Sequence, residues 1–325
     1  MNSIFKYNRQ DLEIKFSERL DFKSSNFLAE VLHDVEGKGI VNILFDFSES
    51  RFITLPAVNF ILCFTSFLRK TNNRNLTTKI KIESKNVISF LTKLRFFSQM
   101  NTYGNLLVPA QLLEEEDFIT KKKYEEKNRT EHSSMIFPLT TILHNQNESD
   151  FEDFGRNFAI LFGHFFTELT LNPDYNFINT KEESQKLFGS LYENIKNVND
   201  HSNSEGFGSI HASSFLKGTI ISFFDSGIGI IRSVLNSKRF EYKNTESEVV
   251  EWALENRHSS KGGDFNHGTG FTIIKRFVDD KNGLMAIRTD KYIFTYKNRI
   301  LKTNNTQKLF PGTQIAIFIP LKEQS

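Results

Sequence analysis

A carboxylate, an amide and an imidazole recur at intervals of four residues in the second half of the chain. They belong to Glu193, Asn197 and His201, with Asp200 beside the last of them. On an α-helix this spacing places the side chains on one face. An amide oxygen can bind Mg²⁺, and a carboxylate one turn away could orient or deprotonate a water molecule. The solvated face of an ordinary amphipathic helix would show the same pattern, so the neighbouring segments must decide between the two.

A second segment places another carboxylate beside two glycines. The apolar run 219–224 leads into Asp225, which is followed by Gly227 and Gly229. A buried strand that ended here would present the carboxylate at its tip, and the glycines would let the backbone approach a flat ligand closely. The carboxylate of Asp225 can accept a hydrogen bond from the exocyclic amine of adenine, which favours adenine over guanine. A tight turn without a ligand is the alternative.

The third segment is rich in glycine and opens a predicted helix. It contains Gly268, Thr269 and Gly270, and the polar loop ahead of it includes Arg257 and Lys261. Free backbone N–H groups and the helix dipole favour an anion at a helix start. A basic side chain from a loop that closes could reach phosphate oxygens. Ordinary helix entry would also account for the glycine pair.

The elements that must position these segments follow from the periodicity of the apolar residues. Thr180 and Glu183 form a capping-box pattern at the start of the helix that carries Glu193. Helical spacing covers residues 151–167, 181–201, 246–256 and 269–279, and strand-like runs cover 208–214, 219–224, 284–289, 292–296 and 313–319. Helices against a mostly antiparallel sheet predict an α+β fold, here a two-layer α/β sandwich.

The first part of the chain alternates strands and helices. Strand-like runs at 40–47 and 78–82 are each followed by helical spacing. The first of these helices begins at Pro56, because the first turn of a helix does not need the N–H group that proline lacks. We expect three regions, namely a small α/β domain at 1–112, a charged linker at 113–135 and a second domain at 136–325.

Composition restricts the partners and the cellular location. The chain has 325 residues and a net charge of +2, which gives no electrostatic reason to predict nucleic-acid binding. No apolar run reaches the roughly 18 to 20 residues that cross a membrane, and the first residues lack a secretory pattern, so we expect a cytoplasmic protein. The single cysteine, Cys63, is predicted to be buried, and the 34 phenylalanines are expected to fill the core.

In order and spacing, the segments of the second domain resemble the GHKL family of ATPases. This family has the Bergerat ATP-binding fold and includes gyrase, histidine kinases and mismatch-repair ATPases. The resemblance covers residues 136–320 and includes Pro311, Gly312 and Thr313 ahead of the last predicted strand. It implies that the domain binds ATP and Mg²⁺.

Residue by residue, the resemblance implies Glu193 as the general base, Asn197 as the magnesium ligand, and Asp225 as the acceptor for adenine beside the turn at Gly227 and Gly229. The other residues expected at the nucleotide are Asp200, His201, Lys261, Gly268, Thr269, Gly270 and Thr313. His201 followed by Ser202 is similar to the anti-sigma-factor serine kinases of the family, whereas Asp200 matches the mismatch-repair pattern.

The first domain resembles the STAS fold of anti-sigma-factor antagonists, on residues 45–57. In that family an aspartate and a serine open a helix, and the serine accepts a phosphate. The corresponding positions hold Thr54 and Leu55. The acceptor hydroxyl is therefore absent unless Thr54 substitutes, and we interpret this STAS-like domain as a regulatory or interaction module.

Three functions follow from these expectations. The preferred one is a slow Mg²⁺-dependent ATPase that acts as a nucleotide-gated signalling switch. The alternatives are a serine or threonine protein kinase that acts on a separate STAS partner, and an interaction module that ATP clamps without turnover. We expect a protein partner through the N-terminal domain, and a homodimer is a second candidate assembly.

Overall fold

The structure, a computed structural model, describes residues 3–71, 76–107, 112–116, 134–142, 148–171, 181–202, 204–236, 245–255 and 270–321. The chain divides into two compact units. The N-terminal unit comprises Met1–His132 with Lys308–Phe310, and the C-terminal unit comprises Ser133–Gln307 with Pro311–Ser325. Within the described residues, no helix is both long and apolar enough to cross a membrane.

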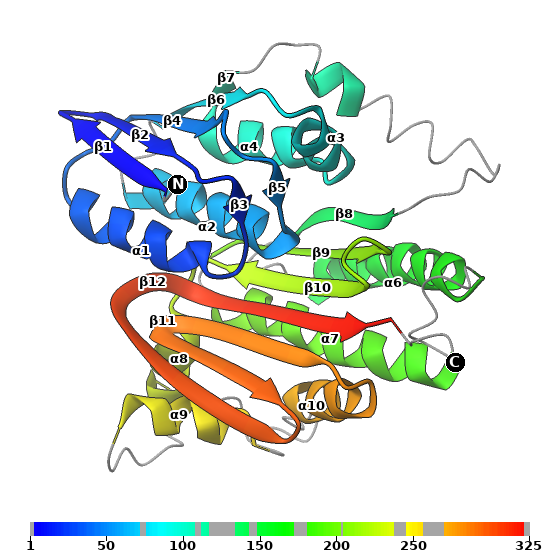
Figure 1. Cartoon of the computed structure of the whole chain (residues 1–325). Helices are drawn as coiled ribbons and strands as arrows, with labels where there is room; N and C mark the ends of the chain where they lie inside the picture. The colour runs from blue at the N-terminus through cyan, green and yellow to red at the C-terminus, as the bar shows by residue number, and fades with distance from the viewer. Residues whose placement is uncertain are drawn as a thin grey trace. The chain divides into compact units, whose positions relative to one another are not determined.

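A five-stranded sheet organises the N-terminal unit, in the order β1-β2-β4-β6-β7 (Figure 1). The pairs from β2 to β7 are parallel, whereas β1 is antiparallel to β2. The strands are β1 (Ile4–Asn8), β2 (Asp11–Lys15), β4 (Asn42–Phe47), β6 (Thr77–Ile82) and β7 (Leu106–Leu107). Two short strands, β3 (Arg19–Leu20) and β5 (Phe52–Ile53), form a separate parallel pair.

Helices connect these strands, as the alternating pattern predicts. Their bounds are α1 (Ser24–Val35), α2 (Leu55–Thr71), α3 (Lys85–Lys93) and α4 (Phe96–Gly104). The helix expected to begin at Pro56 is α2, and Cys63 within it is buried, so both predictions are confirmed. The strands predicted at 40–47 and 78–82 are confirmed as β4 and β6.

Residues 112–116, which include the start of the expected linker, form a further helical turn. The Glu116 side chain is fully buried, and its carboxylate accepts hydrogen bonds from the N–H groups of Phe97 at 2.8 Å and Ser98 at 2.9 Å. These N–H groups belong to the first turn of α4, where a helix has donors without intrahelical partners and favours negative charge. Glu116 therefore belongs to the N-terminal unit and closes the start of α4.

The C-terminal unit has a second five-stranded sheet, in the order β11-β12-β10-β9-β8. The pairs β8–β9, β9–β10 and β10–β12 are antiparallel. The strands are β8 (Ser134–Ile142), β9 (Gly206–Ser213), β10 (Gly218–Asp225), β11 (Leu284–Lys297) and β12 (Ile300–Pro320). Together with the helices, this mixture of elements confirms the α+β class.

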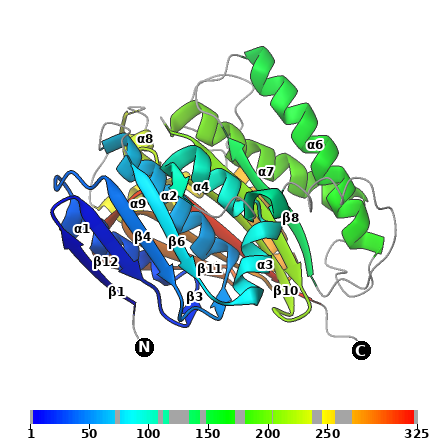
Figure 2. The ribbon, with the colours of Figure 1, turned by 90° about the horizontal axis from the view of Figure 1, so that it is seen from above.

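The helices of this unit share one core with the sheet. They are α6 (Glu148–Leu171), α7 (Lys181–His201), α8 (Gly229–Asn236), α9 (Glu246–Ala253) and α10 (Gly270–Asp280). α6 and α7 lie side by side (Figure 2), with ring contacts from Phe188 of α7 to Phe158 and Phe162 of α6. Apolar side chains of α6 to α10 meet those of the sheet in a single cluster, as the amphipathic patterns predict.

One strand replaces the two that were predicted at 284–289 and 292–296. β11 runs through both, and Asp290 between them has a left-handed backbone with a φ of 52°. Gln307 in β12 is also left-handed, with a φ of 59°. A left-handed residue rotates the strand locally and shifts the in–out alternation of side chains. The pattern therefore breaks at Asp290 although the strand continues.

Candidate functional site

α7 places the first group of predicted site residues. The apolar side of this helix is buried in the core and comprises Leu187, Leu191 and Ile195. Glu193 is half-buried and Asn197 is exposed. The predicted helix of 181–201 is confirmed, and Glu193 and Asn197 lie one turn apart on its outward side. An exposed amide and a partly exposed carboxylate at this spacing can both reach one ligand.

The end of α7 is held by Ser202. Its hydroxyl donates to the carbonyl oxygen of Val198 at 2.6 Å, and its own carbonyl oxygen accepts from the N–H of Ile228 at 3.0 Å. The backbones of Asp200 and His201 form the last turn of α7, but their side chains lie outside what the structure describes. Ser202 thus joins the helix of Glu193 and Asn197 to the loop after β10.

That loop begins at Asp225, the last residue of β10. Asp225 is buried, and one carboxylate oxygen accepts from the N–H of Gly227 at 2.8 Å. Gly227 lies directly against Ser202, since a Cβ on Gly227 would be only 1.8 Å from the Ser202 carbonyl oxygen. A glycine is required here by a contact between two backbone segments, independently of any ligand.

The motif predicted at Pro311, Gly312 and Thr313 also contacts Asp225. The N–H of Thr313 in β12 donates to the second carboxylate oxygen of Asp225 at 3.3 Å. Gly312, with a φ of +77°, lies so close that a Cβ would be 2.0 Å from the Asp225 carbonyl oxygen. Thr313 itself is half-buried. The structure therefore brings the end of α7, the Asp225 loop and residues 312–313 together, although they are far apart in the sequence.

The third segment is described only from Gly270, the first residue of α10; Lys261, Gly268 and Thr269 lie outside the described residues. α10 packs against α7, and Lys281, just after its end, contacts Glu183 in the first turn of α7 at 3.0 Å. The C-terminal end of α10 therefore lies at the N-terminal end of α7.

β11 adds residues that the sequence did not identify. Gly229, which begins α8 with a φ of +76°, has three oxygen atoms around the position of a side chain. They belong to the Thr289 hydroxyl, the Asp290 carboxylate and the Gly312 carbonyl group, at 2.9, 3.1 and 3.2 Å from an ideal Cβ. The Thr289 hydroxyl also accepts from the N–H of Ile230 at 3.0 Å. The only signal in the sequence was the polar interruption of an apolar strand at 288–291.

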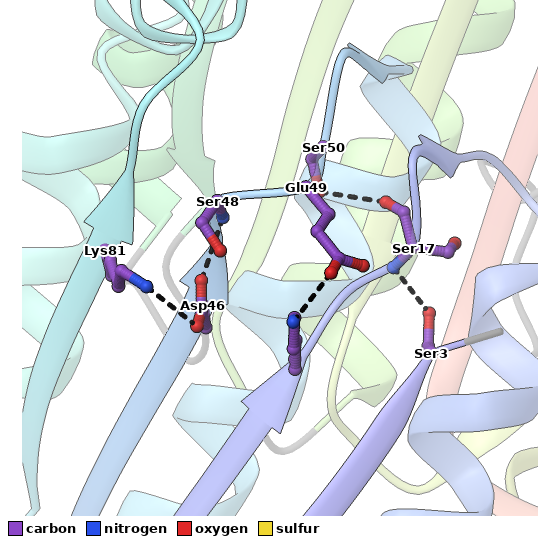
Figure 3. A network of polar contacts seen from close by, with 8 residues as sticks. Ser3, Ser17, Asp46, Ser48, Glu49, Ser50 and Lys81 are labelled. Atoms are coloured by element: carbon purple, nitrogen blue, oxygen red, sulfur yellow. Dashed lines mark hydrogen bonds and ion pairs between the residues drawn. The ribbon is translucent and has the colours of Figure 1, made fainter. Parts of the chain in front are cut away.

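In the N-terminal unit, a polar network lies at the carboxyl ends of β2, β4 and β6 (Figure 3). Asp46 accepts from the N–H of Ser48 at 2.8 Å and contacts Lys81 at 3.5 Å, and Lys15 contacts Glu49 at 2.7 Å. Burial acts to raise the pKa of Asp46, but the hydrogen bonds from Ser48 and the charge of Lys81 outweigh it and hold that pKa below its usual value.

The STAS-like motif itself offers no open hydroxyl in the N-terminal unit. Leu55, the first residue of α2, is fully buried, and Thr54 directly before it is also buried. The N–H of Thr54 donates to the carbonyl oxygen of Leu20 at 2.9 Å. Both side chains therefore belong to the packing at the start of α2.

Within the described residues, no group of three or more His, Cys, Asp or Glu side chains could hold a metal ion. No protein-family model matches the chain, and no curated protein matches it either.

Proposed function

We propose that the C-terminal unit binds ATP with Mg²⁺ in the manner of the GHKL ATPases, and that the chain is a cytoplasmic, nucleotide-dependent signalling switch that hydrolyses ATP slowly. One observation carries the proposal. Ser202 at the end of α7, the loop from Asp225 to Gly229, and Thr313 in β12 are joined by hydrogen bonds of 2.8 to 3.3 Å. If these three segments resembled the family motifs only by chance, they would have no reason to lie together in the fold.

The adenine end of the proposed site is the Asp225 carboxylate. Each of its oxygens accepts one backbone N–H, from Gly227 and from Thr313. A carboxylate can accept about four hydrogen bonds, and the exocyclic amine of adenine is the further donor that we propose for Asp225. The two N–H groups also fix the orientation of the carboxylate, which is the preorganisation that selective recognition of a base requires.

The phosphate end is the region where α10 begins beside α7. The N-terminus of α10 favours an anion, and α10 packs against α7, the helix that carries Glu193 and Asn197. Mg²⁺ usually keeps several waters and takes one or two protein ligands together with phosphate oxygens, so a single exposed amide fits it. When bound, the ion would neutralise developing phosphate charge, and Glu193 would orient or deprotonate the attacking water.

The test is a titration of the purified protein with a fluorescent ATP analogue, with and without Mg²⁺, and with ATP and GTP as competitors. We expect binding that Mg²⁺ strengthens and that ATP displaces better than GTP. Asp225→Asn keeps an oxygen for one backbone N–H but presents an amide donor in place of the second acceptor, so it should abolish the preference for ATP. Absence of binding, or an unchanged preference in a folded Asp225→Asn variant, would sink the proposal.

Hydrolysis is measured separately. Glu193→Gln should bind ATP normally and lose phosphate release, because the amide cannot take a proton from water. Full turnover in this variant would remove Glu193 from the role of base. Labelled phosphate that appears on an added STAS-type protein would select protein phosphorylation, and binding without either product would select a nucleotide clamp.

A further inference from the structure

The start of α8 is held from one side by β11. Thr289 is fully buried, and its hydroxyl accepts the N–H of Ile230, the second residue of the helix. The Asp290 carboxylate oxygen approaches Gly229 beside the Gly312 carbonyl oxygen. Gly229 ends the loop that begins at Asp225, so β11 controls where this loop passes into the helix.

The Asp290 carboxylate is unusual among the groups around this loop. Its Oδ2 atom is buried and has no hydrogen-bond partner. The backbone of Asp290 is left-handed, with a φ of 52°. This conformation is uncommon for residues other than glycine but accessible to aspartate and asparagine. The Oδ2 atom lies 3.1 Å from the position that a Cβ on Gly229 would occupy, and the Thr289 hydroxyl and the Gly312 carbonyl oxygen approach that same position.

The charged groups that face Asp290 come from three elements. Arg232 on α8 and Lys291 on β11 favour its ionised form, whereas Glu246 at the start of α9 disfavours it. Lys291 is already paired with Glu246 at 2.8 Å, and Arg232 is exposed. Burial is the dominant effect and raises the pKa of Asp290 to about 6.

We propose that Asp290 is a positioning residue that holds the loop from Asp225 to Gly229 in its nucleotide-binding form while its carboxyl group is protonated, and that releases this loop when the group ionises. A protonated carboxyl group carries no charge, so it can stay buried beside Gly229 at little electrostatic cost. An ionised one leaves a buried negative charge without a hydrogen-bond partner and gains by moving towards water. The inference rests on the proposed function, since it makes nucleotide affinity depend on pH.

The first arm of the test needs no nucleotide. Hydrogen exchange of the Ile228 and Ile230 amides is measured from pH 5 to 8 and corrected for intrinsic exchange, because these two N–H groups hold the loop to Ser202 and Thr289. Protection should fall roughly tenfold or more across this range in the wild type. Asp290→Asn is neutral at every pH and tolerates the left-handed backbone, so its protection should stay flat and high.

Two neighbouring variants test the electrostatics. Glu246→Gln removes the repelling charge and frees Lys291, so the midpoint of the change in protection should move to lower pH. Arg232→Gln removes an attracting charge, so the midpoint should move to higher pH. A purely structural role of Asp290 would leave these midpoints in place. Unmoved midpoints, or a pH dependence that persists in Asp290→Asn, would overturn the inference.

The second arm compares the nucleotide affinity of the wild type with that of Asp290→Asn at each pH. The variant serves as the reference because the phosphate groups of the nucleotide titrate in the same range and affect both proteins. The wild type should lose affinity relative to Asp290→Asn as the pH rises, by roughly tenfold at pH 7.5. Equal affinities at every pH would reject the inference while leaving ATP binding intact. If no nucleotide bound at any pH, the proposed function would fail, and the exchange measurements would still decide whether Asp290 controls the loop.

Discussion

Replacing Gly227 by alanine tests the contact on which the candidate site depends. The added Cβ would lie 1.8 Å from the oxygen, 2.5 Å from the carbonyl carbon and 2.7 Å from the Cα of Ser202. All three are backbone atoms, so no side-chain rotation can relieve the overlap. The Asp225 loop must move away from α7, and the hydrogen bond from Ile228 to Ser202 is lost.

The magnitude follows from these two effects. A lost hydrogen bond contributes about 1 kcal/mol, and inserting a methyl group into a tightly packed site costs about 1–3 kcal/mol. We therefore expect Gly227→Ala to lower the free energy of unfolding of the C-terminal unit by about 2–4 kcal/mol. Nucleotide affinity should fall as well, because Asp225 and the end of α7 would no longer be held together.

The measurement is urea unfolding followed by fluorescence, with Gly189→Ala as the matched control. Gly189 lies in α7, is exposed, and would place its Cβ in open space. The same chemical change should therefore stabilise the protein by about 0.5–1 kcal/mol, because alanine favours the helix. A Gly227→Ala variant with wild-type stability and binding would refute the packing of the loop against Ser202 and, with it, the assembly of the site.

Three further predictions concern buried charges. Because burial raises the pKa of Asp290 to about 6, from an ordinary value near 3.9, wild-type stability should fall by up to about 2–3 kcal/mol as the pH rises from about 4 to 6. Unfolding curves of Asp290→Asn should lack this fall. Glu116→Ala should destabilise the N-terminal unit by about 1–3 kcal/mol, since two N–H groups of α4 lose their acceptor, and limited proteolysis should cut sooner near residue 116. Glu183→Ala should lower the free energy of unfolding by about 2 kcal/mol or more, because it leaves the ammonium group of Lys281 buried and unpaired. Lys281→Met should lower it by less than about 1 kcal/mol, because Glu183 keeps contact with solvent. Equal losses of stability in thermal unfolding would contradict this difference.

Periodicity was sufficient for the elements with a clear apolar face. α7 has the bounds that its pattern predicts, because Leu187, Leu191 and Ile195 repeat at helical spacing with polar residues between them. β10 was predicted within one or two residues of its bounds, since a strand covered on both faces is continuously apolar.

Periodicity could not predict which segments that are distant in the sequence contact one another in the fold. The pairing of Ser202 with Ile228, and of Asp225 with Thr313, depends on how strands and helices stack in space. α8 was missed because a helix of eight residues contains too few repeats to define a period. Glu116 was assigned to a linker because its sequence neighbours are charged, whereas its burial is explained by two N–H groups about twenty residues earlier.

Asp225 and Asp290 approach the same loop but are prepared for different tasks. Asp225 has an N–H donor on each carboxylate oxygen, and these two hydrogen bonds fix its orientation for the proposed contact with a base. Asp290 has a buried carboxylate oxygen without a hydrogen-bond partner, and burial favours its neutral form. Two carboxyl groups that differ in this way can divide recognition and control between them. Asp225→Asn should therefore change which nucleotide binds at every pH, whereas Asp290→Asn should change only how binding varies with pH. If the two substitutions had the same effect on selectivity and on pH dependence, this division of roles would be wrong.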